Sequence, residues 1–189
     1  MRSIAESDKY LTYIFAKLTT QEDFIRTVAG IILKNNVRDY YVKMSPEVRT
    51  YLKEEVVRCI GDQCTAIRRT AGSIITTIID VSSLDECPGL LRLFTQLLDS
   101  PDVTLIDGTL SALYMICQDS AEKLEDDDHR SGRPLVTLLP KLFTFFTSPH
   151  DAFRHFALGC VNQFIVCMPR VLADNFDTYI KVALLYRLF

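Results

Sequence analysis

The cysteine, histidine and acidic side chains are the groups in this sequence that could perform chemistry. The 189-residue chain has six cysteines and three histidines, but no two cysteines form the Cys-x-x-Cys pair typical of zinc and redox centres. Adjacent acids such as Glu54 and Glu55 point to different sides of a helix, so they are poorly placed for shared acid–base work. There is no glycine-rich phosphate loop, Gly-x-Ser-x-Gly elbow or His-Glu-x-x-His motif. We therefore expect no enzymatic activity, no cofactor and no metal site.

Composition and charge narrow the class of protein further. Nearly half of the residues (48%) are apolar, which allows a substantial core, and five of the six cysteines lie in or beside apolar segments. We interpret these cysteines as reduced thiols packed in that core. A net charge of −3 gives no general attraction to nucleic acid phosphates. No apolar run is long enough to span a membrane and the start lacks a secretory signal pattern, so we expect a soluble intracellular protein.

The elements that must position these residues are predicted to be helices almost throughout, because apolar residues recur with helical rather than strand periodicity. Most prolines fall at the expected boundaries, where their missing N–H does least harm. The predicted helices cover residues 9–18, 23–38, 46–60, 66–79, 88–98, 103–124, 133–146, 152–167 and 176–189. They group into four hairpins, 9–38, 46–79, 88–124 and 133–167, followed by a terminal helix.

The second helices of these hairpins resemble one another. The segments that begin at Ile25, Ile67 and Phe153 share an arginine at the next position and a small residue three positions after it, and the segment at Leu105 is a weaker copy. An interval of about 40 residues with two helices per unit is typical of HEAT or armadillo-type arrays. The sequence thus predicts an all-α superhelix (solenoid), although an ordinary bundle of similar amphipathic helices is an alternative.

Two further features of the sequence, the repeated arginines and one acidic segment, have structural interpretations. The repeated arginines, Arg26, Arg68 and Arg154, are interpreted as structural ladders between repeats. The acidic segment 125–132 is interpreted as a solvated loop, with an acidic contact for a basic partner as the alternative. Its spacing does not match a calcium-binding loop.

Several uncommon strings resemble those of one family. They are residues 29–37, 73–78, 116–122, 133–134, 140–141, 145–146 and 160–165. In this order they are similar to the karyopherin-β nuclear transport receptors of the transportin kind, over about residues 8–180. The resemblance implies a HEAT superhelix that shuttles between cytoplasm and nucleus and whose first repeats bind the GTP form of the small GTPase Ran. Cargo and nucleoporins would be bound only by the full-length receptor.

The same resemblance suggests a fragment that begins where the family's second repeat begins, so we expect weak Ran binding or none. In this family the second helices line the concave face on which Ran sits. The polar positions there, with one aromatic anchor, are the candidate contacts: Thr27, Lys34, Asn35, Arg69, Thr76, Asp107, Tyr114, Gln118 and Asn162. The alternative function is a truncated HEAT scaffold that binds other proteins, or a second copy of itself, without depending on Ran.

Overall fold

A computed structural model describes residues 4–87, 89–125 and 134–185 of the chain. The secondary structure of this part is helical, and no strand occurs in it. Its α-helices are α1 (Ile4–Ala16), α2 (Asp23–Tyr40), α3 (Pro46–Arg58), α4 (Thr65–Val81), α5 (Leu90–Leu97), α6 (Val103–Glu125), α7 (Pro134–Phe143), α8 (Asp151–Asn162), α9 (Arg170–Ala173) and α10 (Phe176–Leu185). Short 3-10 turns follow α2, α3 and α4, at Tyr41–Lys43, Cys59–Gly61 and Leu84–Glu86.

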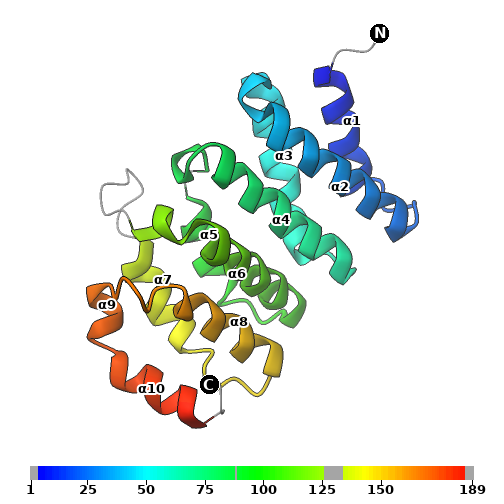
Figure 1. Cartoon of the computed structure of the whole chain (residues 1–189). Coiled ribbons are helices and arrows are strands. Elements are labelled where there is room, and N and C mark those ends of the chain that lie inside the picture. Colours follow the sequence, from blue (N-terminus) through cyan, green and yellow to red (C-terminus); the bar gives the residue numbers. More distant parts are fainter. Residues whose placement is uncertain (1–3, 88, 126–133, 186–189) are drawn as a thin grey trace.

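The helices stack in order along the chain and form two layers (Figure 1). Helices α2, α4, α6 and α8 each pack against the next one and form the second layer, whereas α1 contacts α3 and α5 contacts α7 in the first layer. The α1–α2 pair and α10 lie at opposite ends of the stack. The expected α–α solenoid of about four hairpins and a terminal helix is confirmed.

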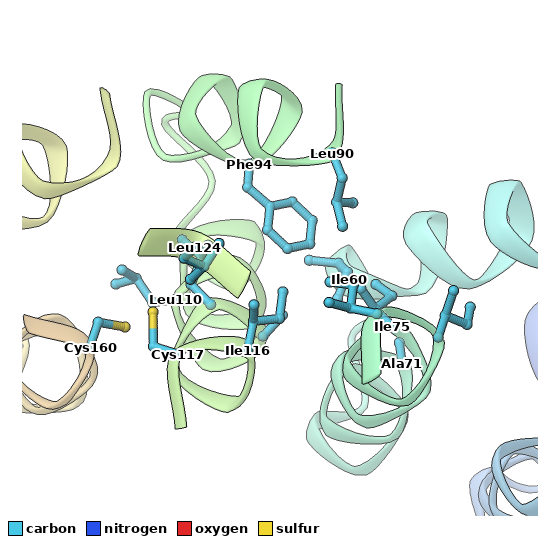
Figure 2. Packing of buried hydrophobic residues seen from close by; sticks show 14 of the residues in the cluster. Ile60, Ala71, Ile75, Leu90, Phe94, Leu110, Ile116, Cys117, Leu124 and Cys160 are labelled. Atoms are coloured by element: carbon cyan, nitrogen blue, oxygen red, sulfur yellow. The ribbon is translucent and has the colours of Figure 1, made fainter. Parts of the chain in front are cut away.

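The core continues from one hairpin to the next, as expected when one hairpin alone cannot bury all its apolar side chains. Figure 2 shows this between α4 and α6, where Ile75 and Ile116 belong to the same cluster of buried side chains. On the other side of α6, Cys117 and Cys160 direct their sulfur atoms toward each other from α6 and α8. Both side chains are fully buried, and burial is the main cause that raises the pKa of the Cys160 thiol.

None of the six cysteines, all of which lie within the described residues, forms a disulfide bond. The predicted packing of cysteines in the core is confirmed for Cys59, Cys117 and Cys160, which are buried. Cys167 is exposed, because it lies in the turn that follows α8 and not in a helix.

Some predicted helix boundaries are wrong, for local reasons. Helix α5 begins at Leu90 and not at Pro88, since Gly89 has φ +79° and so cannot belong to a right-handed helix. Helix α8 ends at Asn162 and not at Cys167, because the next amides bond to carbonyls three residues back. Helix α7 ends at Phe143 in the same way.

The long helix α6 has a break within its predicted span. Ser120 adopts φ −143° and ψ 33°, outside the helical region. The short helix α9 (Arg170–Ala173) has no counterpart among the predicted helices. The predicted acidic loop at 125–132 lies outside the described residues, apart from its first residue at the end of α6.

Candidate functional site

The candidate contact residues are all placed on the second-layer helices. Thr27, Lys34 and Asn35 lie on α2, Arg69 and Thr76 on α4, Asp107, Tyr114 and Gln118 on α6, and Asn162 on α8. Since α2, α4, α6 and α8 pack in series, these residues are spread over four consecutive second-layer helices, and we call them the row.

The α2 and α4 members of the row are available to a partner to different degrees. Asn35 is exposed and accepts a hydrogen bond from Arg38 at 3.0 Å. Thr27 is half-buried, and its hydroxyl donates to the Asp23 carbonyl in the preceding turn at 2.7 Å. Arg69 is exposed and has no ion-pair partner among the described residues. Its guanidinium can therefore pair with an acidic group of a partner without breaking an internal salt bridge.

Two of the candidate residues already use their polar groups in hydrogen bonds within the solenoid. Thr76 is 3% exposed, and its hydroxyl donates to the Gly72 carbonyl at 3.0 Å within α4. Asp107 accepts two hydrogen bonds from Arg68, at 2.8 and 3.2 Å. Thr76 is thus part of the packed helix, and Asp107 belongs to an ion pair between α4 and α6.

Tyr114 lies at the centre of a small aromatic cluster on α6 and α8. Its ring centroid is 5.8 Å from that of His155 and 5.7 Å from that of Phe156. The Tyr114 hydroxyl accepts a hydrogen bond from Gln118 at 2.9 Å. Gly159 allows the close approach, because a Cβ atom there would overlap the Tyr114 ring. The cluster holds the tyrosine in one orientation, as expected of an anchor residue.

The sequence interpretation did not include His155, although a signal for it was present. When the repeat segments are aligned on Ile25, Ile67 and Phe153, His155 takes the position of Thr27 and Arg69. His155 is exposed and adds a second member of the row on α8, in addition to Asn162. Further along α8, Asn162 is exposed, and its side-chain oxygen accepts a hydrogen bond from the buried Tyr179 hydroxyl at 2.5 Å.

Two of the recurring arginines join neighbouring repeats. Arg26 on α2 pairs with Asp62, which precedes α4, at 2.5 Å, and Arg68 on α4 pairs with Asp107 on α6 at 2.8 Å. Arg154 donates to the Ser148 carbonyl and to Asp151 on its own helix. A guanidinium with several donors in fixed positions suits such links, because one side chain can hold two segments at once.

The described residues contain no group of three or more histidine, cysteine or acidic side chains that could hold a metal ion. In the same part of the chain, no helix combines the length and the apolar character needed to cross a bilayer. A surface hollow of about 380 Å³ is lined by Lys9, Glu47 and Tyr51. These residues lie on first-layer helices, α1 and α3, so the hollow is separate from the row on the second layer.

Comparison with known proteins identifies the relatives of the chain. The family model of the importin-beta N-terminal domain matches residues 5–62. Transportin from Dictyostelium discoideum is 40% identical over 179 residues, which cover 95% of this chain and 19% of that protein. Transportin-1 from Homo sapiens is 37% identical over 174 residues, 92% of this chain and 19% of that protein.

Solved structures show the same fold. Kap95p, in a structure in which its binding induces the switch loops of RanGDP to adopt the GTP-bound conformation, has a TM-score of 0.76 and 14% identity over 96% of this chain and 22% of its own. Yeast importin-beta (Kap95p) has a TM-score of 0.70 and 16% identity, over 93% of this chain and 21% of its own.

The sequence relatives and the solved structures agree on one kind of protein. The chain spans about one fifth of the length of the curated relatives it matches. Its similarity to the transportins extends over nearly all of its own length, and its helices form the solenoid seen in importin-beta. The chain belongs to the importin-β family of nuclear import receptors.

Proposed function

We propose that this chain is a portion of a transportin-like nuclear import receptor and that its second-layer helices bind the GTP form of Ran. The observation that carries the proposal is the row of exposed polar side chains on consecutive second-layer helices, with Tyr114 held in place as an anchor. Membership of the importin-β family supports it. A protein of the same fold, Kap95p, binds Ran.

The proposed contact surface follows from the exposure of the candidate residues. Thr76 and Asp107 are left out, because their polar groups bond within the solenoid, and His155 is added. The proposed surface comprises Thr27, Lys34, Asn35, Arg69, Tyr114, Gln118, His155 and Asn162. Binding of this kind depends on a few well-packed anchors and on charge complementarity, without covalent chemistry.

Selectivity for the GTP form would come from the partner. The switch segments of a small GTPase are ordered by contacts to the γ-phosphate and are released when GTP is hydrolysed. A surface that spans several repeats contacts such segments over a wide area, so it distinguishes their two conformations. Cargo and nucleoporin binding, and shuttling between cytoplasm and nucleus, are functions that we assign to a full-length receptor.

The first test compares nucleotide states of Ran. The purified chain is titrated with Ran loaded with a non-hydrolysable GTP analogue, and with Ran loaded with GDP. We expect selective binding of the GTP form, weaker than that of a full-length receptor, because the chain spans about one fifth of its relatives. A folded, helical chain that binds neither form, or binds both equally, would contradict the proposal and favour a scaffold that does not depend on Ran.

The second test locates the surface through one arginine. We predict that Arg69→Glu weakens binding of the GTP form by about tenfold or more. The reason is that a glutamate would repel the acidic group of the partner with which the Arg69 guanidinium is proposed to pair. Arg92→Glu is the matched control, because Arg92 is also exposed but lies on the first-layer helix α5. Exposed substitutions of this kind leave stability nearly unchanged. Equal weakening by both variants would show that binding does not use this surface.

A further inference from the structure

Helices α6 and α8 meet across a pair of cysteines. Figure 2 shows Cys117 on α6 and Cys160 on α8 with their sulfur atoms directed toward each other, and both side chains are 0% exposed. Burial raises the pKa of the Cys160 thiol, and a hydrogen bond between the two thiols adds to this effect. The two sulfur atoms are therefore in direct interaction, although they belong to different hairpins.

Two other thiols of the chain have partners in their own turn instead. The Cys59 thiol donates to the Glu55 carbonyl at 3.4 Å, and the Cys167 thiol donates to the Phe164 carbonyl at 3.2 Å. These hydrogen bonds link residues that are three or four positions apart. The α6–α8 pair differs because it connects two consecutive helices of the second layer.

Packing between second-layer helices does not require cysteines at these positions. In the alignment of the four repeat segments, Cys117 corresponds to Ile79 on α4, and Cys160 corresponds to Ala112 on α6. Ile79 and Ala112 are also 0% exposed. The preceding junction, between α4 and α6, thus fills the same two positions with aliphatic side chains. A thiol packs like a small apolar group, but it also brings reactivity that an aliphatic side chain lacks.

The geometry of two packed helices suits a bond between such residues. Helix axes in contact are about 8–10 Å apart, and each Cα atom lies about 2.3 Å from its axis. Cα atoms that face each other across the junction therefore come within the roughly 4.4–6.8 Å that a disulfide bond needs. The close approach of α6 and α8 is also visible beside the pair, because a Cβ atom at Gly159 would lie 2.3 Å from the Tyr114 ring.

We propose that Cys117 and Cys160 form a reversible disulfide bond that links the third hairpin to the fourth when a peroxide oxidises the chain. One thiol loses its proton and attacks a peroxide oxygen, so that the O–O bond breaks and a sulfenic acid and one water are formed. The other thiol then attacks the sulfenic sulfur, the S–S bond forms, and the oxygen leaves as a second water. The two thiols together give up two electrons and two protons, which reduce one peroxide to two waters. A thiol reductant reverses the bond by exchange.

Burial determines when this reaction occurs. The thiolate is the reactive form of cysteine, and the raised pKa of Cys160 makes its thiolate scarce. Peroxide reaches the buried pair only when the α6–α8 junction opens locally. Closure of the junction then brings the second thiol onto the sulfenic acid, and the resulting bond holds the junction closed. The inference does not depend on Ran binding.

The test treats the purified chain with hydrogen peroxide and maps its cysteines by mass spectrometry without reduction. We expect a peptide cross-linked through Cys117 and Cys160 that forms more slowly than the exposed Cys167 is oxidised and that dithiothreitol removes. The cross-linked chain should unfold at a temperature several degrees higher than the reduced chain, because the bond constrains the unfolded state.

Cys160→Ala is the matched variant, because alanine already occupies the corresponding position in the preceding junction as Ala112. After peroxide treatment it should contain no such cross-link and show no rise in unfolding temperature. Cys117→Val is a second variant with the same expectation, and circular dichroism shows whether each variant is folded. Cys64→Ala is the control, since Cys64 is half-buried just before α4, and it should keep both the cross-link and the rise.

Three results would overturn the proposal. In the first, peroxide oxidises Cys167 completely while Cys117 and Cys160 remain unlinked in the folded chain. In the second, cross-links to other cysteines form in place of this one. In the third, the cross-linked chain unfolds at the same temperature as peroxide-treated Cys160→Ala, or at a lower one.

Discussion

At the scale of single residues, Asp8 in α1 is an unusual group for a core. Its side chain is fully buried. One carboxylate oxygen accepts a hydrogen bond from Asn36 at 2.7 Å, and the other has no partner among the described residues. Burial outweighs this hydrogen bond and raises the pKa of the Asp8 carboxyl. Asp8 therefore lowers the stability of the fold when it is ionised.

The pH dependence of this effect has a definite sign. Because the folded pKa is above the unfolded one, the folded chain binds more protons between the two pKa values, and stability falls as pH rises through that window. We predict that Asp8→Asn increases the free energy of unfolding by about 1 kcal/mol at neutral pH. The gain should shrink as the pH falls through the folded pKa. Urea unfolding followed by circular dichroism measures both.

Asp39→Asn serves as the control for this experiment, because Asp39 is exposed near the end of α2. It should change the free energy of unfolding by less than about 0.5 kcal/mol. Burial of the carboxylate would not be the dominant effect if Asp8→Asn lowered the free energy of unfolding at neutral pH. The same would follow if the stability gained by this variant increased as the pH falls.

Residue-level environments were only partly predictable from the sequence. The position of Arg69 on a second-layer helix was predicted from the repeat pattern. The environment of Asp107 was not, because its partner Arg68 is 39 residues away in the chain. Thr76 is polar by type, but a threonine within a helix can satisfy its hydroxyl on the carbonyl four residues before it. Such a residue can be buried without cost, so polarity alone did not indicate exposure.

At the scale of elements, the approach of α6 to the 3-10 turn Cys59–Gly61 that follows α3 depends on Gly108. A Cβ atom at this position would overlap the Ile60 carbonyl oxygen and would lie 3.0 Å from the Arg68 side chain. The obstacle at Ile60 is backbone, which cannot rotate away as a side chain can. The missing side chain therefore sets how closely these two elements pack, and it also leaves room for the Arg68–Asp107 pair.

We predict that Gly108→Ala destabilises the chain by about 1–3 kcal/mol, as overpacking does. The sign is informative, because alanine in place of glycine within a helix otherwise stabilises by about 1 kcal/mol. Gln118→Ala on the exposed side of the same helix is the control and should be nearly neutral. Thermal and urea unfolding compare the variants. A gain in stability for Gly108→Ala would show that α6 can shift without cost.

The helices themselves were predicted well, and their ends less so. Long amphipathic segments such as α2 and α4 have a periodic apolar face that specifies a helix whatever its neighbours are. The ends of α7 and α8 depend on whether amides bond three or four residues back. A 3-10 turn, with bonds three residues back, and an α-helical turn, with bonds four residues back, differ little in energy. The apolar pattern of the sequence does not distinguish them. Helix α9 is too short to show a period at all.

At the scale of the whole molecule, each second-layer helix packs mainly against its neighbours in the series. Stability in such an array is approximately the sum of local terms and neighbour contacts, so it differs from one repeat to the next. Helix α4 has a neighbour on each side and buries Ile67, Ile74 and Ile78 almost completely. Helix α2 has one such neighbour and leaves large apolar side chains such as Phe24, Val28 and Ile31 exposed.

We therefore predict that amide hydrogen exchange is slowest in α4 and α6 and faster in α2 and α10, because local opening of an end breaks fewer buried contacts. Exchange is measured by mass spectrometry on the purified chain. Uniform protection of all helices would instead indicate a single cooperative unit, in which an end repeat is as stable as the centre.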